Sequence, residues 1–382
     1  MTTDLLRRMT GRDPGEEHRA STPLELLFDL CFVVAVAQAG TQLHHALADG
    51  HLAGVLGYLM VFFAIWWAWM NFTWFASAYD TDDVGYRLLT LLQIAGVLVL
   101  AAGVPAAFEH YDYAVITAGY VVMRLALIGQ WLRAARQDPA GRPAALRYAA
   151  GVAVVQVGWV VRLALPGWWG YVGFAVLVVA ELAVPVWAES GGRQTPWHPG
   201  HMAERYGLFT LIVLGECVAA ATVAVQSAVT EHGVSPDLLV IAVGGLVLLF
   251  SMWWAYFKRE VSGGLRVSLR TSILWGYGHY LIFAAAAAVG AGLSTAAGEH
   301  ALSASATAAT IAVPAVIYLG VSAALHATLV PDALRVPVVV AVLVLMLAAA
   351  AAGDAIGLPA AVAVIGALGA LLVVFLVQTA ER

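Results

Sequence analysis

Long apolar stretches recur along the whole sequence, separated by short polar connections. A helix needs roughly 20 apolar residues to cross the hydrocarbon core of a bilayer, whereas barrel strands are about half as long and alternate in polarity. We therefore predict an all-α fold, a polytopic transmembrane helical bundle of about 12 spans. The expected spans are residues 24–47, 51–77, 87–108, 111–133, 145–165, 168–188, 201–228, 237–258, 271–294, 302–327, 335–353 and 357–379.

The composition agrees with a surface that faces lipid. Hydrophobic residues make up 62% of the chain and charged residues 11%, compared with roughly 45–50% and about 25% in soluble domains. Residues 1–20 are polar and lack the apolar core of a signal peptide. We expect them to form a cytoplasmic tail that precedes a retained first span.

Basic residues gather in alternate connections, and the intervening connections carry acidic residues without Lys or Arg. Because basic residues near span ends stay on the cytoplasmic side, both termini are expected in the cytoplasm. The scarcity of Lys, with much Ala, Val and Gly, is typical of a GC-rich bacterial gene. We therefore expect the protein in a bacterial inner membrane. The lipid bilayer is the expected partner, and nothing indicates nucleic acid. The basic positions are Arg7, Arg8, Arg12, Arg19, Arg133, Arg136, Arg142, Arg147, Lys258, Arg259, Arg266 and Arg270.

A weak internal repeat relates the two halves of the chain. The segment 65–70, Ile-Trp-Trp-Ala-Trp-Met, resembles 252–257, Met-Trp-Trp-Ala-Tyr-Phe, and a polar connection follows each. Transporters often contain such duplications, so we predict two parallel six-helix pseudo-repeats, residues 21–190 and residues 196–382. The alternative is coincidence, because Trp is common at membrane interfaces.

Ionisable side chains inside apolar spans cost about 2.5–3.5 kcal/mol each, so each needs an explanation. Glu25 stands three residues after Thr22, which is the spacing of a helix capping box. Asp29 lies one turn further along, and Glu216 lies near the middle of its span; neither has an evident partner. These two carboxylates are the first candidates for binding or relaying a cation or a proton.

Several polar side chains are expected at a similar depth in the membrane. Counting about 1.5 Å per residue from the cytoplasmic end of each span puts them roughly 8–13 Å deep. Such a layer could line a hydrated cavity between the two halves, or Arg124 could instead form a structural ion pair with Glu181 or Asp29. The residues of this layer are Asp29, Asn71, Gln93, Arg124, Glu181 and His279.

No phosphate-binding loop, dinucleotide fingerprint, serine nucleophile elbow or zinc-protease motif is present. No catalytic residue, cofactor or metal site is therefore predicted. His44, His45 and His51 gather at the end of the first span, but adjacent histidines on a helix point about 100° apart and suit a metal poorly.

Two sequence blocks resemble the bacterial low temperature requirement A (LtrA) family. The first is Leu24-Glu-Leu-Leu-Phe-Asp-Leu30, and the second runs from His201-Met-Ala-Glu-Arg-Tyr-Gly-Leu-Phe-Thr210 to Gly215-Glu216. The resemblance covers nearly the whole chain, with Leu27 and Cys31 as mild departures. It implies a membrane protein but no particular activity, because the family is defined by sequence and an association with growth in the cold. The residues that match the blocks are Glu25, Phe28, Asp29, Glu204, Arg205 and Glu216.

We expect a transporter or channel that moves a small solute, a cation or protons along a polar pathway between the halves. A membrane-embedded enzyme acting on a lipid or polyprenyl substrate is one alternative, with Asp80, Asp82 and Asp83 as its acidic cluster. A membrane sensor or scaffold is the other.

Overall fold

The computed structural model describes residues 5–13, 15–16, 19–191, 194–258, 262–265, 268–329 and 336–380. Every regular element in these ranges is a helix. The first part of the chain forms α1 (Pro23–Ala48), α2 (Gly54–Tyr79), α3 (Val84–Ala102), α4 (Val104–His110), α5 (Ala114–Gln137), α6 (Arg142–Arg162), α7 (Trp168–Glu189) and α8 (Pro199–His232). The remainder forms α9 (Pro236–Phe257), α10 (Ser262–Leu265), α11 (Leu269–Ala297), α12 (Ala304–Leu329), α13 (Val336–Ala351), α14 (Gly353–Ile356) and α15 (Leu358–Ala380).

Eleven helices in the described part of the chain are long and apolar enough to cross a membrane, when α3 and α4 are counted together. The shorter apolar helix α13 stands where the eleventh span was expected. The prediction of an all-α polytopic bundle is confirmed. Sidedness stays a prediction, and Arg259 and Arg266, on which it partly depends, lie outside the described residues.

The helices begin where the sequence offers capping groups. The Thr22 hydroxyl accepts from the Glu25 backbone N–H at 3.3 Å, and the Glu25 carboxylate accepts from the Thr22 N–H at 2.8 Å. This is the expected capping box at the start of α1. Asp83 caps α3 and Ser235 caps α9 in the same way, each accepting a backbone N–H three residues later.

The chain divides into two compact units. Unit 1 contains Met1–Ala35 and Phe63–Arg205, and unit 2 contains Val36–Phe62 and Tyr206–Arg382. The boundaries pass through α1, α2 and α8, so each of these helices contributes one segment to each unit. The predicted halves, 21–190 and 196–382, and the repeat that relates them stay predictions.

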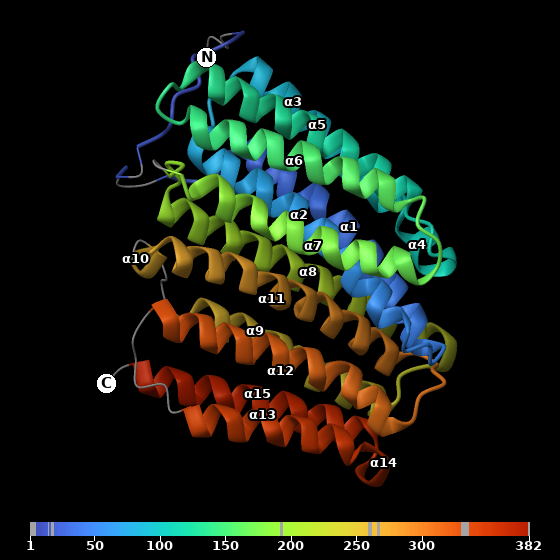
Figure 1. Ribbon diagram of the computed structural model, residues 1–382. Coiled ribbons are helices and arrows are strands. Elements are labelled where there is room, and N and C mark those ends of the chain that lie inside the picture. Colours follow the sequence, from blue (N-terminus) through green and yellow to red (C-terminus); the bar gives the residue numbers. More distant parts are fainter. Residues whose placement is uncertain are drawn as a thin grey trace. The chain divides into compact units, whose positions relative to one another are not determined.

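Glycines allow close helix packing inside each unit. In unit 1, α3 lies beside α5 (Figure 1), and a Cβ added at Gly119 would stand only 2.5 Å from the Gly96 carbonyl oxygen. In unit 2, α9 packs against α15, and a Cβ at Gly366 would stand 2.4 Å from the Gly244 carbonyl oxygen. Small residues at helix contacts are typical of membrane bundles, where van der Waals packing replaces the hydrophobic effect.

The two tryptophan-rich segments that suggested the repeat differ in burial. Trp66, Trp67 and Trp69 of α2 are at most 1% exposed, whereas Trp253 and Trp254 of α9 are 46% and 52% exposed. The α2 segment therefore belongs to the interior of unit 1. The α9 pair has the exposure expected of side chains that face lipid.

Candidate functional site

Four charged or titratable side chains of α1 and α8 meet in the interior of unit 1. Glu25 and Asp29 are four residues apart on α1, and His201 and Arg205 are four residues apart on α8; all four are fully buried. Arg205 Nη1 and His201 Nε2 each lie 3.1 Å from Glu25 Oε1, and Arg205 Nη2 pairs with Asp29 Oδ1. We call this group the α1–α8 ion cluster.

Neighbouring groups complete the surroundings of this cluster. The Trp69 indole N–H donates to Asp29 Oδ1 at 2.7 Å. Arg19 lies 4.0 Å from Glu25 and donates to the last carbonyls of α2, those of Ala76 and Ser77. The sequence shows no partner for Asp29, but the structure supplies two, Arg205 and Trp69. The cluster therefore ties the start of α8 to α1 and α2.

Glu204 stands beside the ion cluster at the start of α8. Its Oε1 accepts the Ser21 backbone N–H at 3.2 Å, just before the first turn of α1. Four of the residues that match the two family blocks, Glu25, Asp29, Glu204 and Arg205, are thus brought together in unit 1, where Phe28 of the first block is also buried. Glu216 of the second block lies elsewhere, in unit 2.

Arg124 and Glu181 form a second buried ion pair in unit 1. Arg124 Nη2 lies 3.2 Å from Glu181 Oε1, and both side chains are only 2% exposed. The Trp67 indole donates to Glu181 Oε2 at 2.6 Å, and the Trp159 indole donates to Oε1 at 3.1 Å. Arg124 also donates to the Tyr120 hydroxyl and stacks over that ring, 4.5 Å from its centroid. Of the two partners considered for Arg124 at a similar depth in the membrane, Glu181 and Asp29, the one it contacts is Glu181.

Two buried amides of unit 1, Asn71 and Gln93, are hydrogen-bonded to protein groups. Asn71 Nδ2 donates to the Trp67 carbonyl on its own helix at 2.7 Å. Gln93 Nε2 donates to Gln130 Oε1 at 2.9 Å, and Gln130 in turn donates to Thr90 at 3.2 Å. These bonds join α3 to α5. A pathway role for Asn71 and Gln93 stays a prediction.

The acidic connection between α2 and α3 has a basic partner for each carboxylate. Arg87 forms a bidentate ion pair with Asp82, in which Nε and Nη2 each donate to one carboxylate oxygen at 2.8 Å. Asp83 accepts from Arg133 Nη1 at 2.9 Å, and Asp80 lies 3.8 Å from Arg19. Although burial opposes its ionisation, Asp83 has its pKa lowered to about 2 by hydrogen bonds from Arg133 and from backbone N–H groups.

The pKa of Asp80 is shifted the opposite way. Burial, followed by the negative charge of Glu25, raises it to about 6, and the nearby Arg19 only partly offsets this rise. The pKa values of Asp80 and Asp83 are therefore shifted in opposite directions. Each already holds a structural contact.

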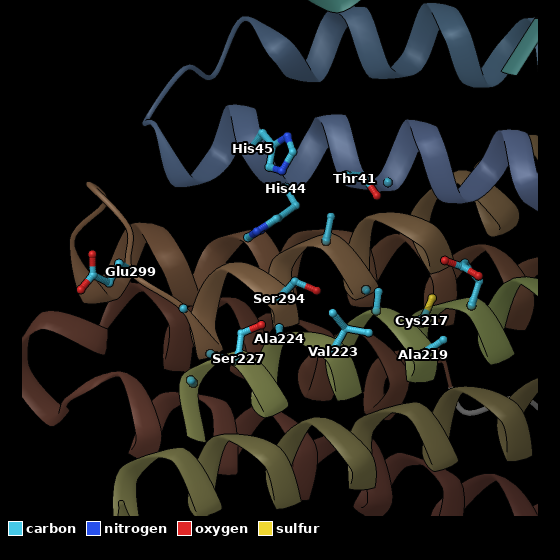
Figure 2. Close-up of a pocket in the computed structure, with 18 of the residues that line it drawn as sticks. Thr41, His44, His45, Cys217, Ala219, Val223, Ala224, Ser227, Ser294 and Glu299 are labelled. Atoms are coloured by element: carbon cyan, nitrogen blue, oxygen red, sulfur yellow. The ribbon is translucent and has the colours of Figure 1, made fainter. Parts of the chain in front are cut away.

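A pocket of about 680 Å³ lies in unit 2, between the second part of α1, α8 and α11. Figure 2 shows Thr41, His44 and His45 on one helix and Ser294 on another, facing a third that carries Cys217, Val223 and Ser227. Glu299 lies at one end of the pocket and Cys217 toward the other (Figure 2). We call it the α8 pocket.

The charged groups that line the α8 pocket are acidic. Its described lining includes the carboxylates of Glu216, Glu231 and Glu299 and no Lys or Arg. Glu231 and Glu299 belong to the exposed end, where His232 Nε2 lies 3.6 Å from Glu299. Glu216 lies further along α8, inside a membrane-spanning helix, and no described residue forms a hydrogen bond or ion pair with its carboxylate. The pocket therefore favours positively charged occupants.

His279 lies outside the α8 pocket lining, in the interior of unit 2. Its Nδ1 is 2.7 Å from the Trp275 carbonyl oxygen, and its Nε2 is 2.8 Å from the Tyr256 hydroxyl. Among the residues that the structure describes, no group of three His, Cys, Asp or Glu side chains is arranged to hold a metal ion.

Sequence reasoning missed several members of these sites. His201 stands four residues before Arg205 in the quoted block, and that spacing could have placed both on one face. Trp67 and Trp69 were interpreted only as part of the internal repeat and not as hydrogen-bond donors. A buried indole needs a hydrogen-bond acceptor, so they could have been paired with intramembrane carboxylates.

The comparisons with known proteins agree with the resemblance found in the sequence. An uncharacterised protein of Rhizobium meliloti (strain 1021) is 30% identical over 255 residues, which cover 64% of this chain and 60% of that protein. The chain thus spans less than two thirds of that relative's length. The model of the bacterial low temperature requirement A protein family matches residues 20–376. With its many membrane-spanning helices, this chain is therefore a multi-pass membrane protein that belongs to the bacterial low temperature requirement A (LtrA) family.

Proposed function

We propose that the protein is a transporter or channel for a small cationic solute or ion, and that Glu216 in the α8 pocket is its binding carboxylate. The observation that carries this proposal is an acidic pocket inside the helices of unit 2 whose deepest carboxylate has no basic partner among the described residues. By contrast, the carboxylates of the α1–α8 ion cluster have Arg205 beside them.

The cost of placing a carboxylate in a membrane-spanning segment supports this role. Such a group costs about 2.5–3.5 kcal/mol at the centre of a helix even on the more lenient scale. Glu181 offsets this cost through Arg124 and two indole donors. Glu216 has no comparable partner in the described structure, so a bound cation or proton is the simplest compensation.

The dimensions of the pocket fit a small solute. Ligand sites commonly occupy about 300–1,000 Å³, and the α8 pocket falls within this range at about 680 Å³. Small residues such as Gly40, Ala220 and Ala224 line it and leave the space open. Its hydroxyl groups, from Thr41, Ser227 and Ser294, can replace part of the hydration shell of a cation.

Flux measurements on purified protein in liposomes test the proposal. We expect uptake of Na⁺, K⁺, protons or methylammonium above that of empty vesicles, and a strong reduction in Glu216→Gln. Glu109→Gln serves as the matched control, because Glu109 is an exposed carboxylate of unit 1. Flux equal to that of empty vesicles for all four cations, from protein that is folded, would refute the proposal. Equal flux in the two variants would show that Glu216 is not the binding group.

A further inference from the structure

Three titratable or hydroxyl side chains follow one face of α12 in unit 2. Tyr318, Ser322 and His326 are spaced four residues apart and are between 0% and 8% exposed. Side chains at this spacing lie one above another on a helix. α12 is one of the helices long and apolar enough to span the membrane. This is an unusual line of polar groups for a buried helix face.

Two of these groups have no hydrogen-bond partner in the described structure. Both the Tyr318 hydroxyl and the Ser322 hydroxyl are buried without one. An unsatisfied buried hydroxyl costs about 1–3 kcal/mol, and internal water usually satisfies such groups. The two hydroxyls therefore point to water or a hydrated proton as their ligand.

Tyr256 and His279 extend this line across α9 and α11. The Trp275 carbonyl can only accept, so His279 Nδ1 carries the proton that faces it. His279 Nε2 then accepts the hydrogen bond from the Tyr256 hydroxyl at 2.8 Å. The Tyr256 ring also lies 6.0 Å from the ring of His326. These residues provide hydroxyl and imidazole groups that can each accept one proton and release another.

The line begins beside the α8 pocket. Cys217 lines the pocket next to Glu216 and donates through its Sγ to the Ala286 carbonyl of α11 at 3.0 Å, and α11 packs against α12, which carries Tyr318. The pocket extends to Glu299, just before α12 begins, whereas His326 lies in the last turn of α12. Tyr318 and His326 are about 12 Å apart along the helix axis, at 1.5 Å per residue. The pocket and the polar line together therefore extend between opposite ends of unit 2.

We propose that Tyr318, Ser322, Tyr256, His279 and His326 form a proton pathway that connects Glu216 in the α8 pocket with the opposite end of unit 2. This inference rests on the proposed function, because Glu216 is the group that exchanges protons with the pathway. Each hydroxyl or intervening water accepts one proton on one side, releases another on the other side and then rotates back. His279 takes up and releases its proton at Nε2, because its Nδ1 faces the Trp275 carbonyl, which cannot pass a proton on. Histidine and carboxylate relays of this kind occur in membrane pumps and transporters.

The test uses the full-length protein in liposomes that contain the pH-sensitive dye pyranine. The initial rate of proton entry after an external acid step is compared among wild type, Tyr318→Phe and Ser322→Ala. Tyr58→Phe is the matched control, because the Tyr58 hydroxyl is also buried in unit 2 but donates to the Ala284 carbonyl at 2.6 Å. Circular dichroism and gel filtration check that each variant is folded.

We expect Tyr318→Phe and Ser322→Ala to slow proton entry at least about tenfold, equivalent to a barrier increase of about 1.4 kcal/mol, and Tyr58→Phe to leave it unchanged. Replacing water by deuterium oxide should slow wild-type entry. If both pathway variants conduct protons at the wild-type rate while Glu216→Gln loses cation flux, the pathway is wrong and the proposed function stands. If wild-type protein admits no protons, the pathway is also wrong. If wild-type protein carries none of the tested cations, the proposed function itself is refuted.

Discussion

The Arg124–Glu181 pair allows a quantitative test of what buried charge contributes in unit 1. Removing one member of a buried ion pair costs about 3–5 kcal/mol, because the other charge is left without compensation. In Arg124→Met, Glu181 keeps its hydrogen bonds from Trp67 and Trp159, so we expect a loss near 3 kcal/mol. In Glu181→Gln, Arg124 keeps a full charge whose Nε and Nη1 have no hydrogen-bond partner among the described residues, so we expect a loss near 5 kcal/mol.

The double variant removes both charges at once. The side-chain carbonyl of the glutamine that Glu181→Gln introduces can still accept an indole N–H, so little buried polarity is left unpaired. We expect the double variant to be more stable than the sum of the two single losses by at least about 2 kcal/mol. Arg124→Lys is a useful further variant, because it keeps the charge but loses the stacking on Tyr120.

Unfolding by SDS in mixed micelles, followed by tryptophan fluorescence and circular dichroism, gives the free energies of unfolding. Losses that add within about 0.5 kcal/mol would refute the coupling and with it the role of the pair as a lock between α5 and α7. A wild-type free energy of unfolding in Arg124→Met, combined with complete loss of flux, would assign Arg124 to the transport pathway instead.

The remaining predictions concern the connection between α2 and α3 and the contact of α3 with α5. Burial raises the pKa of Asp80 from 3.8 to about 6, so between these pH values the folded state binds more protons than the unfolded state. The free energy of unfolding therefore falls as pH rises from about 4 to 6. Asp80→Asn should remove this slope and stabilise the protein above pH 6 by about 3 kcal/mol, measured by unfolding at several pH values. For Asp83, whose pKa is lowered to about 2, the stabilisation is complete above about pH 4 and is lost as pH falls toward 2, so Asp83→Asn should cost about 2 kcal/mol at neutral pH. Gly119→Ala should cost about 1–3 kcal/mol of stability, because its added Cβ would meet backbone atoms of α3 at 2.5 Å. Gly129→Ala on the same helix should be neutral or stabilising, because the nearest atoms to its added Cβ are at 3.9 Å. Equal effects of the two variants in a melting experiment would exclude backbone contact as the cause.

Features determined by local sequence were predictable, and features that depend on distant segments were not. The membrane-spanning helices follow from runs of apolar residues, and the capping box of Thr22 and Glu25 follows from residues three positions apart. The partner of Asp29 is Arg205, 176 positions away, and no local pattern indicates which helices pack together. Arg124 and Glu181 were an intermediate case, because equal depth in the bilayer limits the choice of partner even across two helices.

The α8 pocket was not predictable from the residues that line it. Most of them are small apolar or hydroxyl residues, which are also the residues that let membrane helices pack closely. In α9 and α15, Gly244 and Gly366 bring two backbones together, whereas Gly40 in the pocket lining has no atom within 4 Å of an added Cβ. The same residue type therefore closes one helix contact and leaves space at another, depending on the spacing of the helices.

The two units differ in how the carboxylates inside their membrane-spanning helices are paired, and this difference supports placing the proposed transport role in unit 2. In unit 1, Glu25, Asp29 and Glu181 each have an arginine beside them, and Asp29 and Glu181 also have indole donors, so their charges are compensated within the folded protein. A cation that entered there would have to displace an arginine, at a cost of several kcal/mol. In unit 2, Glu216 borders an acidic pocket, and the nearby polar groups are hydroxyls and imidazoles, which exchange protons without a permanent charge. For the proposed transport function, we therefore expect the side chains of unit 2 to contact the solute and the ion pairs of unit 1 to stabilise the helices of unit 1.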